Sequence, residues 1–382
     1  MSENKNVPEL RFPGFEGQWL VHQLSQACNM KAGKFVQASE IHNEKESGMY
    51  PCFGGNGLRG YTRSKTHEGI YPLIGRQGAL CGNVQLANGQ FHATEHAVVV
   101  EASEQNDALW LYYLLDTLKL NRYATGQAQP GLSVDVIEKI KAYFPSLSEQ
   151  QKIADFLSAV DKKIEQLTEK HRLLTEYKKG VMQQIFSQQI RFKDDEGNEY
   201  PEWVSIRLNK LATINPRASS LPSSFIYIDL ESVEKGRLVK QEVVQLDSAP
   251  SRAQRLLTEN DILFQMVRPY QKNNYFFNDE GDFVASTGYA QIQYEDAPRF
   301  LYYALHLEDF VDKVMALCTG TSYPAINSSD LGSIKINLPS NIDEQQKIAE
   351  FLTEIDNKID QAWLKLEQTK AFKKGLLQRL FV

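Results

Sequence analysis

The sequence predicts an α+β fold: two globular α/β domains joined by two long helices, arranged as a pseudo-two-fold internal repeat. The main observation is a duplication, because residues 148–186 recur at 343–381 at a constant offset of 195, without a gap and with 18 of 39 positions identical. Each copy follows a longer stretch rich in strand and turn signals. We therefore predict domains at 1–147 and 187–342, and spacer helices at 148–186 and 343–382.

Each repeated segment is predicted to be one continuous helix. Ser148 with Gln151, and Asp343 with Gln346, fit the capping-box pattern, and a proline lies just upstream of each copy. At 1.5 Å per residue a helix of this length spans roughly 58 Å, so two of them packed together would form a stiff rod. The competing interpretation, ordinary amphipathic helices of one globular core, is disfavoured by gapless repetition at distant places in the chain.

Apolar residues recur in both helices at alternating spacings of four and three, and we call this heptad row the seam. In the first copy the seam consists of Ile153, Leu157, Val160, Ile164, Leu167, Leu174, Val181 and Ile185, and in the second of Ile348, Leu352, Ile355, Ile359, Ala362, Leu366, Leu376 and Leu380. Four polar residues interrupt it, namely His171, Lys178, Thr369 and Lys373. We expect the two seams to face each other, and the four interruptions to contact a partner instead.

Composition is that of an ordinary globular protein, with 42% hydrophobic and 24% charged residues over 382 positions. No apolar run approaches 18 residues and no signal-peptide pattern follows Met1, so we expect a cytoplasmic protein without a membrane partner. Four cysteines show no metal-binding or disulfide spacing, which predicts no metal site; they are Cys28, Cys52, Cys81 and Cys318.

The net charge of −6 argues against a general DNA-coating protein. No predicted segment carries a basic excess of more than one residue. Any nucleic-acid binding must therefore come from local clusters.

Between 31 and 100 the first domain is predicted to form short strands and glycine-rich turns. The side chains on these turns belong to types that contact base edges and phosphates, and as a set we expect them to bind DNA, although each alone fits a solvated surface. They are Asn56, Arg59, Tyr61, Arg63, Lys65, Arg76, Gln77 and Asn83.

The second domain repeats the frame of the first but not its middle. Trp19 and Trp203, each expected to plug the start of a core, precede Leu24 and Leu208 by five residues. A predicted helix at 110–116 and the TGQAQPGLS turn are matched by FLYYAL and CTGTSYPAI. The differing middle, 216–297, supplies a second set of expected DNA contacts: Arg252, Arg255, Arg268, Tyr270, Lys272, Asn273, Asn274 and Tyr289.

Catalytic motifs are missing from the sequence. FGGNG, at 53–57, superficially fits a loop that binds S-adenosylmethionine, but no helix pattern follows it and no NPPY or DPPY motif occurs. A Walker A motif is also missing, so ATP chemistry is not predicted here. We assign no catalytic residues.

The chain resembles the specificity (S) subunit of type I restriction-modification systems over essentially its whole length. The resemblance rests on the RFPGF start, the GGNGLRGY and GRQGALCGNV segments, the TGQAQPGLS and CTGTSYPAI turns, and the twice-occurring EQQKIA helix start. It implies target recognition domains at about 15–147 and 198–342, each reading one half of a bipartite sequence in double-stranded DNA.

The resemblance further implies that the helices pair as an antiparallel coiled coil, fix the gap between the half-sites and dock two methyltransferase subunits, which restriction (translocase) subunits join. The chain itself would bind no cofactor: S-adenosylmethionine, ATP and Mg are expected on the partner subunits. The expected helix and partner interface comprises Glu149, Gln150, Ile153, Phe156, Leu157, Ile164, Glu344, Gln345, Ile348, Phe351, Leu352 and Ile359.

Two other interpretations stay open at this point. A single-chain methyltransferase would transfer methyl groups unaided, and a coiled-coil adaptor would be indifferent to DNA sequence.

Overall fold

The computed structural model describes residues 6–126 and 130–382 and divides the chain into two compact units. Unit 1 consists of Met1–Glu169 and Trp363–Val382, and unit 2 consists of Lys170–Ala362. Each unit therefore holds one globular domain and about half of each long helix. Residues 1–5, at the polar start, and 127–129, within the TGQAQPGLS turn, lie outside the described part. The domain boundaries inferred from the sequence remain a prediction.

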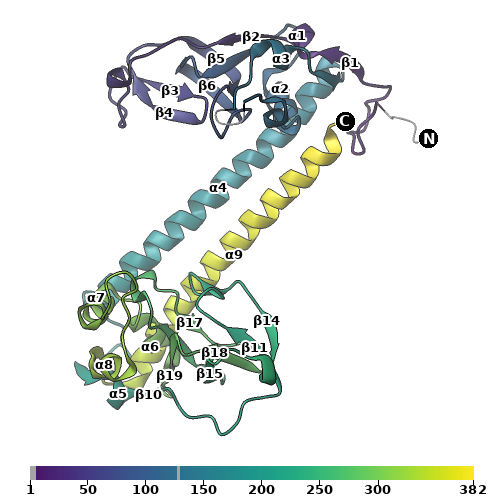
Figure 1. Ribbon diagram of the computed structural model, residues 1–382. Helices are drawn as coiled ribbons and strands as arrows, with labels where there is room; N and C mark the ends of the chain where they lie inside the picture. The colour runs from purple at the N-terminus through teal and green to yellow at the C-terminus, as the bar shows by residue number, and fades with distance from the viewer. Residues whose placement is uncertain (1–5, 127–129) are drawn as a thin grey trace. The chain divides into compact units, whose positions relative to one another are not determined.

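Unit 1 is built on a six-stranded sheet with the order β2-β7-β5-β6-β3-β4 (Figure 1). Its neighbouring strands are antiparallel except β3 and β6, which are parallel. The strands are β2 (Cys28–Ala32), β3 (Tyr50–Gly54), β4 (Gly57–Thr62), β5 (His67–Gly75), β6 (Val84–Ala93) and β7 (Ala97–Ala102). Strands over 31–100 are thus confirmed, although β5 and β6, with 9 and 10 residues, are longer than the short strands predicted. FGGNG is the β3–β4 turn, followed by a strand, so it is not a methyltransferase loop.

Short elements complete the domain of unit 1. α2 begins after Asp107, whose carboxylate accepts a hydrogen bond from the N–H of Trp110 at 2.8 Å. The elements are α1 (Leu24–Ala27), η1 (Ala38–Glu40), α2 (Ala108–Thr117), η2 (Leu120–Tyr123), α3 (Val134–Glu138) and the two-stranded ribbon of β1 (Leu20–Gln23) with β8 (Lys141–Phe144). α2 confirms the helix predicted at 110–116.

Unit 2 contains two four-stranded sheets, β10-β19-β16-β17 and β14-β11-β18-β15, with a hairpin and a ribbon beside them. The strands are β9 (Trp203–Arg207), β10 (Thr213–Ile214), β11 (Ser224–Ile228), β12 (Val233–Glu234), β13 (Arg237–Leu238), β14 (Glu242–Gln245), β15 (Ala253–Leu256), β16 (Ile262–Gln265), β17 (Tyr275–Phe276), β18 (Phe283–Ser286), β19 (Tyr289–Gln293) and β20 (Lys335–Pro339). The short helices are α5 (Leu208–Leu211), η3 (Leu246–Ser248), η4 (Pro269–Gln271), α6 (Pro298–Ala304), α7 (Glu308–Leu317) and α8 (Ser328–Ser333).

Equivalent backbone hydrogen bonds occur at the start of the two domains. The N–H of Leu24 donates to the carbonyl of Ile140 at 3.0 Å, and the N–H of Leu208 donates to Ile334 at 2.9 Å. Both leucines are completely buried. Trp19 packs edge-on against Trp110 in the core of unit 1, and Trp203 is partly buried in the core of unit 2, as predicted.

The long helices are α4 (Leu147–Phe186) and α9 (Ile342–Leu380), close to the predicted limits. Their caps were predicted wrongly. The hydroxyl of Ser146 accepts the N–H of Glu149 at 3.4 Å, and the side-chain oxygen of Asn341 accepts the N–H of Asp343 at 2.7 Å. The N-cap residues are therefore Ser146 and Asn341, each two positions before the predicted caps, Ser148 and Asp343.

In each unit the start of one long helix lies beside the end of the other, so the helices are antiparallel (Figure 1). Every predicted seam residue is buried or half-buried. Two of the polar interruptions were assigned wrongly, because they bind the other helix: Lys178 pairs with Asp356 in unit 2 and Lys373 with Asp161 in unit 1, both at 2.6 Å. The expectation of partner contacts at His171 and Thr369 stays a prediction.

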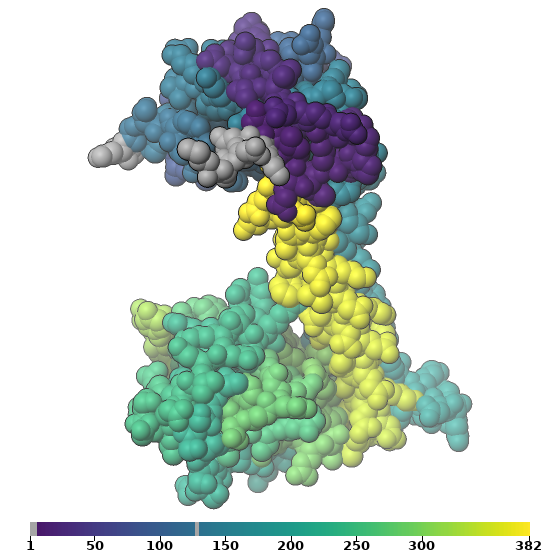
Figure 2. All heavy atoms as spheres, turned by 90° about the vertical axis from the view of Figure 1, so that its right-hand side faces the viewer, coloured from purple at the N-terminus to yellow at the C-terminus, as the bar shows by residue number. Residues whose placement is uncertain are grey.

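The first described residues of the chain lie against the end of α9 in unit 1 (Figure 2). The N–H of Leu10 donates to the carbonyl of Arg379 at 2.8 Å, and Arg379 pairs with Glu9. In unit 2 the N–H of Ile190 donates to the carbonyl of Gln184, at the equivalent place on α4. The duplication therefore extends to the way the chain arrives at each domain.

Candidate DNA interface

A loop that rests on a turn forms the candidate contact surface of unit 1. Residues 76–83 follow β5 and lie against the turn that ends at Gly131. The N–H of Gly78 donates to the carbonyl of Pro130 at 3.0 Å, and the N–H of Leu132 donates to the carbonyl of Arg76 at 2.9 Å. These two bonds fix the loop to the turn.

Unit 2 contains the same arrangement, although the sequences of the two loops share no pattern. Residues 266–274 follow β16 and rest on the turn at 319–325. The N–H of Arg268 donates to Pro324 at 2.7 Å, and the N–H of Ile326 donates to Met266 at 3.0 Å. Arg268 therefore occupies the structural position that Gly78 holds in unit 1.

Backbone geometry supports a functional role for the second loop. Gly78 has a φ of 83°, which glycine adopts without strain, but Arg268 at the equivalent position has a φ of 53° and Lys272 has a φ of 54°. Non-glycine residues rarely adopt this left-handed conformation, and such residues concentrate at binding sites. Arginine is therefore held here against its backbone preference.

In unit 1 several buried polar atoms near the loop lack a partner among the described residues. Arg76 is half-buried, and one terminal nitrogen donates to the carbonyl of Glu95 at 3.4 Å while its Nε has no partner. The hydroxyl of Thr94 and one carboxylate oxygen of Glu95 are also unpaired. Gln77 and Asn83 are exposed. Unpaired buried groups cost roughly 1–3 kcal/mol each, so the structure carries a polar cost beside this loop.

The β3–β4 turn approaches this loop closely because it is made of glycine. A Cβ on Gly55 would lie 2.7 Å from the carbonyl oxygen of His96 and 3.5 Å from the backbone nitrogen of Arg76. The exposed side chains of Asn56 and Arg59 follow directly. The structure thus brings Asn56, Arg59 and Arg76 to one edge of the domain.

Other predicted residues of unit 1 are engaged in local contacts. Arg63 pairs with Glu46 at 3.2 Å and Lys65 with Glu68 at 2.8 Å, all four side chains being solvent-accessible. Tyr61 is half-buried. Exposed pairs of this kind are weak and can exchange their carboxylate for a phosphate.

In unit 2 an exposed aromatic ring lies beside the strained arginine. The guanidinium of Arg268 lies 5.4 Å from the centre of the Tyr323 ring, which is 67% exposed, and Tyr270 is 50% exposed. Tyr323 was not among the predicted residues. The sequence analysis treated the CTGTSYPAI segment that contains Tyr323 only as a duplicated turn. The aromatic ring of Tyr323 was the feature of that turn that could have indicated a binding role.

Buried nitrogen atoms without a partner also occur in unit 2. They are the Nε atoms of Arg255 and Arg268, and burial lowers the pKa of Arg255. Arg252 is exposed. Of these three predicted arginines, Arg252 therefore lies in solvent, whereas Arg255 and Arg268 each keep one buried donor without a partner.

Two predicted contacts of unit 2 need correction. Asn274 is 1% exposed and accepts the N–H of Gln265 at 2.8 Å, and Tyr289 is completely buried in a hydrophobic cluster. Neither side chain reaches a surface where DNA could lie. Lys272 and Asn273 hold the loop in place, since Lys272 pairs with Glu308 at 2.7 Å and Asn273 accepts the N–H of Lys235 at 3.1 Å.

The helix starts also differ from the expected partner interface. Glu149 is 1% exposed and pairs with Arg11 at 2.7 Å, and Glu344 is completely buried and pairs with Arg191 at 2.8 Å. These glutamates attach each domain to its own helix start, so they are not available to a partner.

Glutamines and apolar residues complete these junctions. The side chains of Gln150 and Gln345 donate to the carbonyls of Pro145 and Pro339 at 3.0 and 2.8 Å. Most of the remaining predicted residues lie in the cores or partly packed against them, namely Ile153, Phe156, Leu157, Ile348, Phe351, Leu352 and Ile359, and Ile164 is half-buried.

Neither a metal site nor a membrane segment is found in the described residues. No group of potential ligands could hold a metal ion within 6–126 and 130–382, and the four cysteines are free thiols. Over the same residues, no helix has the length and apolar character needed to cross a membrane.

The fold defines a duplicated scaffold in which each domain is attached to a helix start and presents its own loop surface. The chain matches the family model described as the type I restriction modification DNA specificity domain twice, over residues 16–175 and 201–368. Because these matches cover most of its length, the chain belongs to this family. The resemblance inferred from the sequence is confirmed.

Named relatives and a solved structure agree with this family assignment. The chain is similar to the type I restriction enzyme EcoprrI specificity subunit of Escherichia coli, 46% identical over 39% of this chain and 38% of that subunit. It is 26% identical to the MjaVIII specificity subunit of Methanocaldococcus jannaschii over 98% and 94% of the two chains. The crystal structure of the S subunit from M. genitalium matches with a TM-score of 0.72 at 18% identity, over 98% and 99%.

These findings confirm the predicted fold class. The relatives are named specificity subunits of type I restriction enzymes, in agreement with the family that the sequence resembles.

Proposed function

We propose that this chain reads a bipartite sequence in double-stranded DNA, one half with each domain. The observation that carries the proposal is the pair of equivalent loops with different side chains. Unit 1 presents Arg76 and Gln77 on the loop that unit 2 fills with Arg268 and Tyr270. Arginine recognises guanine and glutamine recognises adenine in the major groove, so one scaffold with exchanged side chains suits two half-sites.

The paired helices are proposed to set the gap between the half-sites and to dock two methyltransferase subunits. A pseudo-two-fold repeat offers the same surface twice, which suits two copies of one partner. Restriction subunits would then join the complex. S-adenosylmethionine, ATP and Mg would bind on these partner subunits, because the chain has no motif for them.

The test compares Arg76→Ala with Arg268→Ala in DNA binding and in methylation by the assembled complex. Each change should relax or abolish recognition of one half-site, at roughly 1–3 kcal/mol for a bidentate contact, and leave the other half-site requirement intact. Arg122→Ala, on η2, is a matched control that should change neither. Equal weakening on all sequences would assign the two arginines to phosphate contacts and contradict the proposal of base reading.

A further inference from the structure

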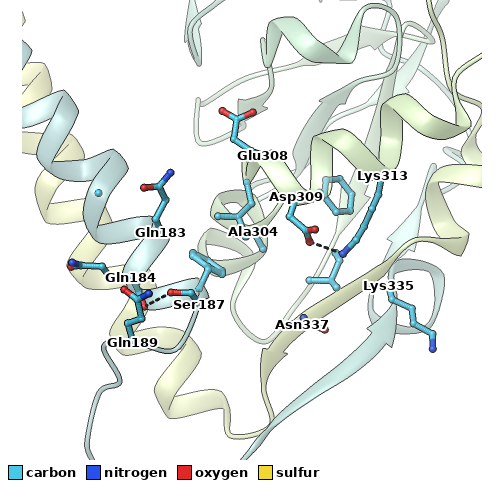
Figure 3. A pocket seen from close by; sticks show the side chains of 15 residues that line it. Gln183, Gln184, Ser187, Gln189, Ala304, Glu308, Asp309, Lys313, Lys335 and Asn337 are labelled. Atoms are coloured by element: carbon cyan, nitrogen blue, oxygen red, sulfur yellow. Dashed lines mark hydrogen bonds and ion pairs between the residues drawn. The ribbon is translucent and has the colours of Figure 1, made fainter.

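Arg268, on the loop of unit 2, is a cation without a counter-ion, whereas two lysines of the same unit are paired. Lys272 of this loop pairs with Glu308, at the start of α7, at 2.7 Å. Glu308 also lines a cavity of about 640 Å³, in which Lys313 pairs with Asp309 at 2.6 Å (Figure 3). Among residues 6–126 and 130–382, no carboxylate pairs with Arg268. The charge of its guanidinium is therefore not neutralised by a neighbouring side chain.

The backbone of Arg268 is held in a conformation that its own sequence disfavours. Its φ is 53° and its ψ is 53°, and it precedes Pro269, although the residue before a proline normally adopts extended backbone. The N–H of Arg268 donates to the carbonyl of Pro324 at 2.7 Å, and the N–H of Gln271 donates to the carbonyl of Arg268 at 3.0 Å. These two bonds hold the arginine in place, so its side chain leaves the loop in a fixed direction.

Tyr323 is fixed in the turn on which the loop rests. It precedes Pro324, which favours extended backbone at the tyrosine. The N–H groups of Thr319 and Ala325 each donate to the carbonyl of the other at 2.9 Å, and these bonds close the turn. Gly320 has a φ of 90°, and a Cβ on it would lie 3.2 Å from the carbonyl oxygen of Tyr323. The turn is therefore tightly closed around the residue that carries the ring.

These two fixed backbones bring the arginine and the tyrosine together. The guanidinium carbon of Arg268 lies 5.4 Å from the centre of the Tyr323 ring, which is 67% exposed. A guanidinium is attracted to the face of an aromatic ring, so the ring limits the orientations that it can adopt. The Nε of Arg268 is buried without a partner, which leaves the two terminal nitrogens as its donors toward a ligand.

An oriented guanidinium suits a base better than a phosphate. Guanine presents O6 and N7 side by side at its edge in the major groove, and two parallel N–H donors are needed to pair with both. A phosphate accepts hydrogen bonds from many directions, so it gains little from a donor with a fixed orientation. A long side chain also loses conformational freedom when it binds, and a ring that already restricts it lowers this cost.

We propose that Tyr323 is a positioning residue that holds the guanidinium of Arg268 for bidentate recognition of a guanine in the half-site of unit 2. This inference rests on the proposed reading of DNA by each domain, and it adds the base and the ring that orients the arginine. In the sequence of unit 1 no aromatic residue lies between Gly126 and Pro130, so we expect this pair in unit 2 only.

The test uses the chain assembled with the methyltransferase subunits of its own system and measures DNA binding by competition. The half-site of unit 2 is the one whose requirement is lost in Arg268→Ala. Each guanine of that half-site is then replaced singly by 7-deazaguanine, which lacks N7 but still pairs with cytosine. At one guanine this replacement should weaken binding at least about tenfold. With Tyr323→Leu the same replacement should weaken binding only about twofold, because about fivefold of the discrimination depends on the ring.

Three further variants separate the ring from its surroundings. Tyr323→Phe keeps the ring face and should retain the discrimination. Tyr123→Leu is the matched control, because the guanidinium of Arg122 lies 4.9 Å from the centre of the Tyr123 ring in unit 1, and it should leave this guanine requirement unchanged. Adding Tyr323→Leu to Arg268→Ala should remove no further discrimination, because the ring acts through the arginine.

Several results would overturn the inference and leave the proposed function intact. One is full discrimination in Tyr323→Leu, and another is a half-site in which no 7-deazaguanine weakens binding. Equal weakening of Tyr323→Leu on natural and substituted DNA would assign the ring to the DNA backbone. Failure of Tyr323→Phe would assign the role to the hydroxyl. An unaltered complex without sequence preference would instead overturn the proposed function, and this inference with it.

Discussion

Replacing Asp356 with alanine should destabilise unit 2 by about 2 kcal/mol, because this carboxylate has two polar partners inside the seam. It accepts hydrogen bonds from the ammonium of Lys178 at 2.6 Å and from the hydroxyl of Tyr303 at 2.8 Å. The ammonium also lies 4.8 Å from the centre of the Tyr303 ring. Removing the carboxylate leaves the ammonium without its acceptor, whereas the hydroxyl of Tyr303 keeps the hydroxyl of Thr353 at 3.2 Å as a partner.

The magnitude follows from partial burial. The side chains of Lys178 and Asp356 are 22% and 29% exposed. Breaking a fully buried pair costs about 3–5 kcal/mol, and losing an exposed pair costs about 0–1 kcal/mol, so an intermediate value is expected. Replacing both partners with apolar residues, Lys178→Met with Asp356→Leu, should cost less than the alanine variant, because no charge is then left unpaired.

Urea unfolding followed by hydrogen exchange is the assay, since it resolves the two units separately. Asp360→Ala removes a carboxylate that is 61% exposed on the same helix and should cost less than about 1 kcal/mol. Asp161→Ala is an internal replicate in unit 1, because Asp161 accepts from Tyr113 at 2.8 Å and pairs with Lys373 at 2.6 Å.

Two results would refute this reasoning. If Asp356→Ala cost no more than Asp360→Ala, burial would not be strengthening the pair. If the losses in free energy of unfolding from Lys178→Met and Asp356→Leu simply added, the two side chains would not be coupled, and their contact would not stabilise the seam.

Three further predictions concern the loop, a domain junction and a buried histidine. Arg268→Gly should raise the stability of unit 2 by roughly 1 kcal/mol in urea unfolding by relieving the left-handed backbone, while recognition of one half-site is lost; lower stability would show that the guanidinium packing on Tyr323 dominates. Arg191→Met should cost about 3–5 kcal/mol in the same assay, because the buried Glu344 then loses its charged partner and keeps only the indole N–H of Trp203 at 3.4 Å, and a loss below about 1 kcal/mol would contradict it. Burial lowers the pKa of His306 to about 4, so unit 2 should lose up to roughly 3 kcal/mol as the pH falls from about 6.5 to 4, where only the unfolded chain takes up the proton. His306→Gln should flatten that slope in pH-dependent unfolding; an unchanged slope would assign it to carboxylates.

The long helices were predictable because their signal is periodic and repeated, so that errors at single positions do not alter the result. Both were placed within two residues of their limits. Their caps were missed because Ser146 and Asn341 lie among other polar residues, and several nearby side chains could accept the same N–H groups. The polar seam positions were misjudged for another reason: the carboxylate that pairs with each lysine lies on the other helix, 178 residues away for Lys178 and 212 for Lys373.

The candidate site was predictable by residue type but not by position. Arg76 and Arg268 were both selected from the sequence, yet nothing in GRQG or VRPY shows that the two loops are equivalent. That equivalence lies in backbone hydrogen bonds to Pro130 and Pro324, which side-chain patterns do not record. Asn274 was misassigned because a polar residue in a loop is usually exposed, whereas here it satisfies the backbone of a buried strand.

The contrast between repeated and altered residues separates assembly from recognition. Identity is retained where a side chain holds the helices or a domain junction together, as at Lys178 and Lys373, or at Glu149 and Glu344. It is lost at the loops, where only the backbone bonds to the turn persist. A substitution on a loop can therefore change a surface without disturbing the helix pair, whereas a substitution in the repeated set acts on the helix pair or on a domain junction. We expect exchanged loops to alter one half-site and leave the number of bound methyltransferase subunits unchanged.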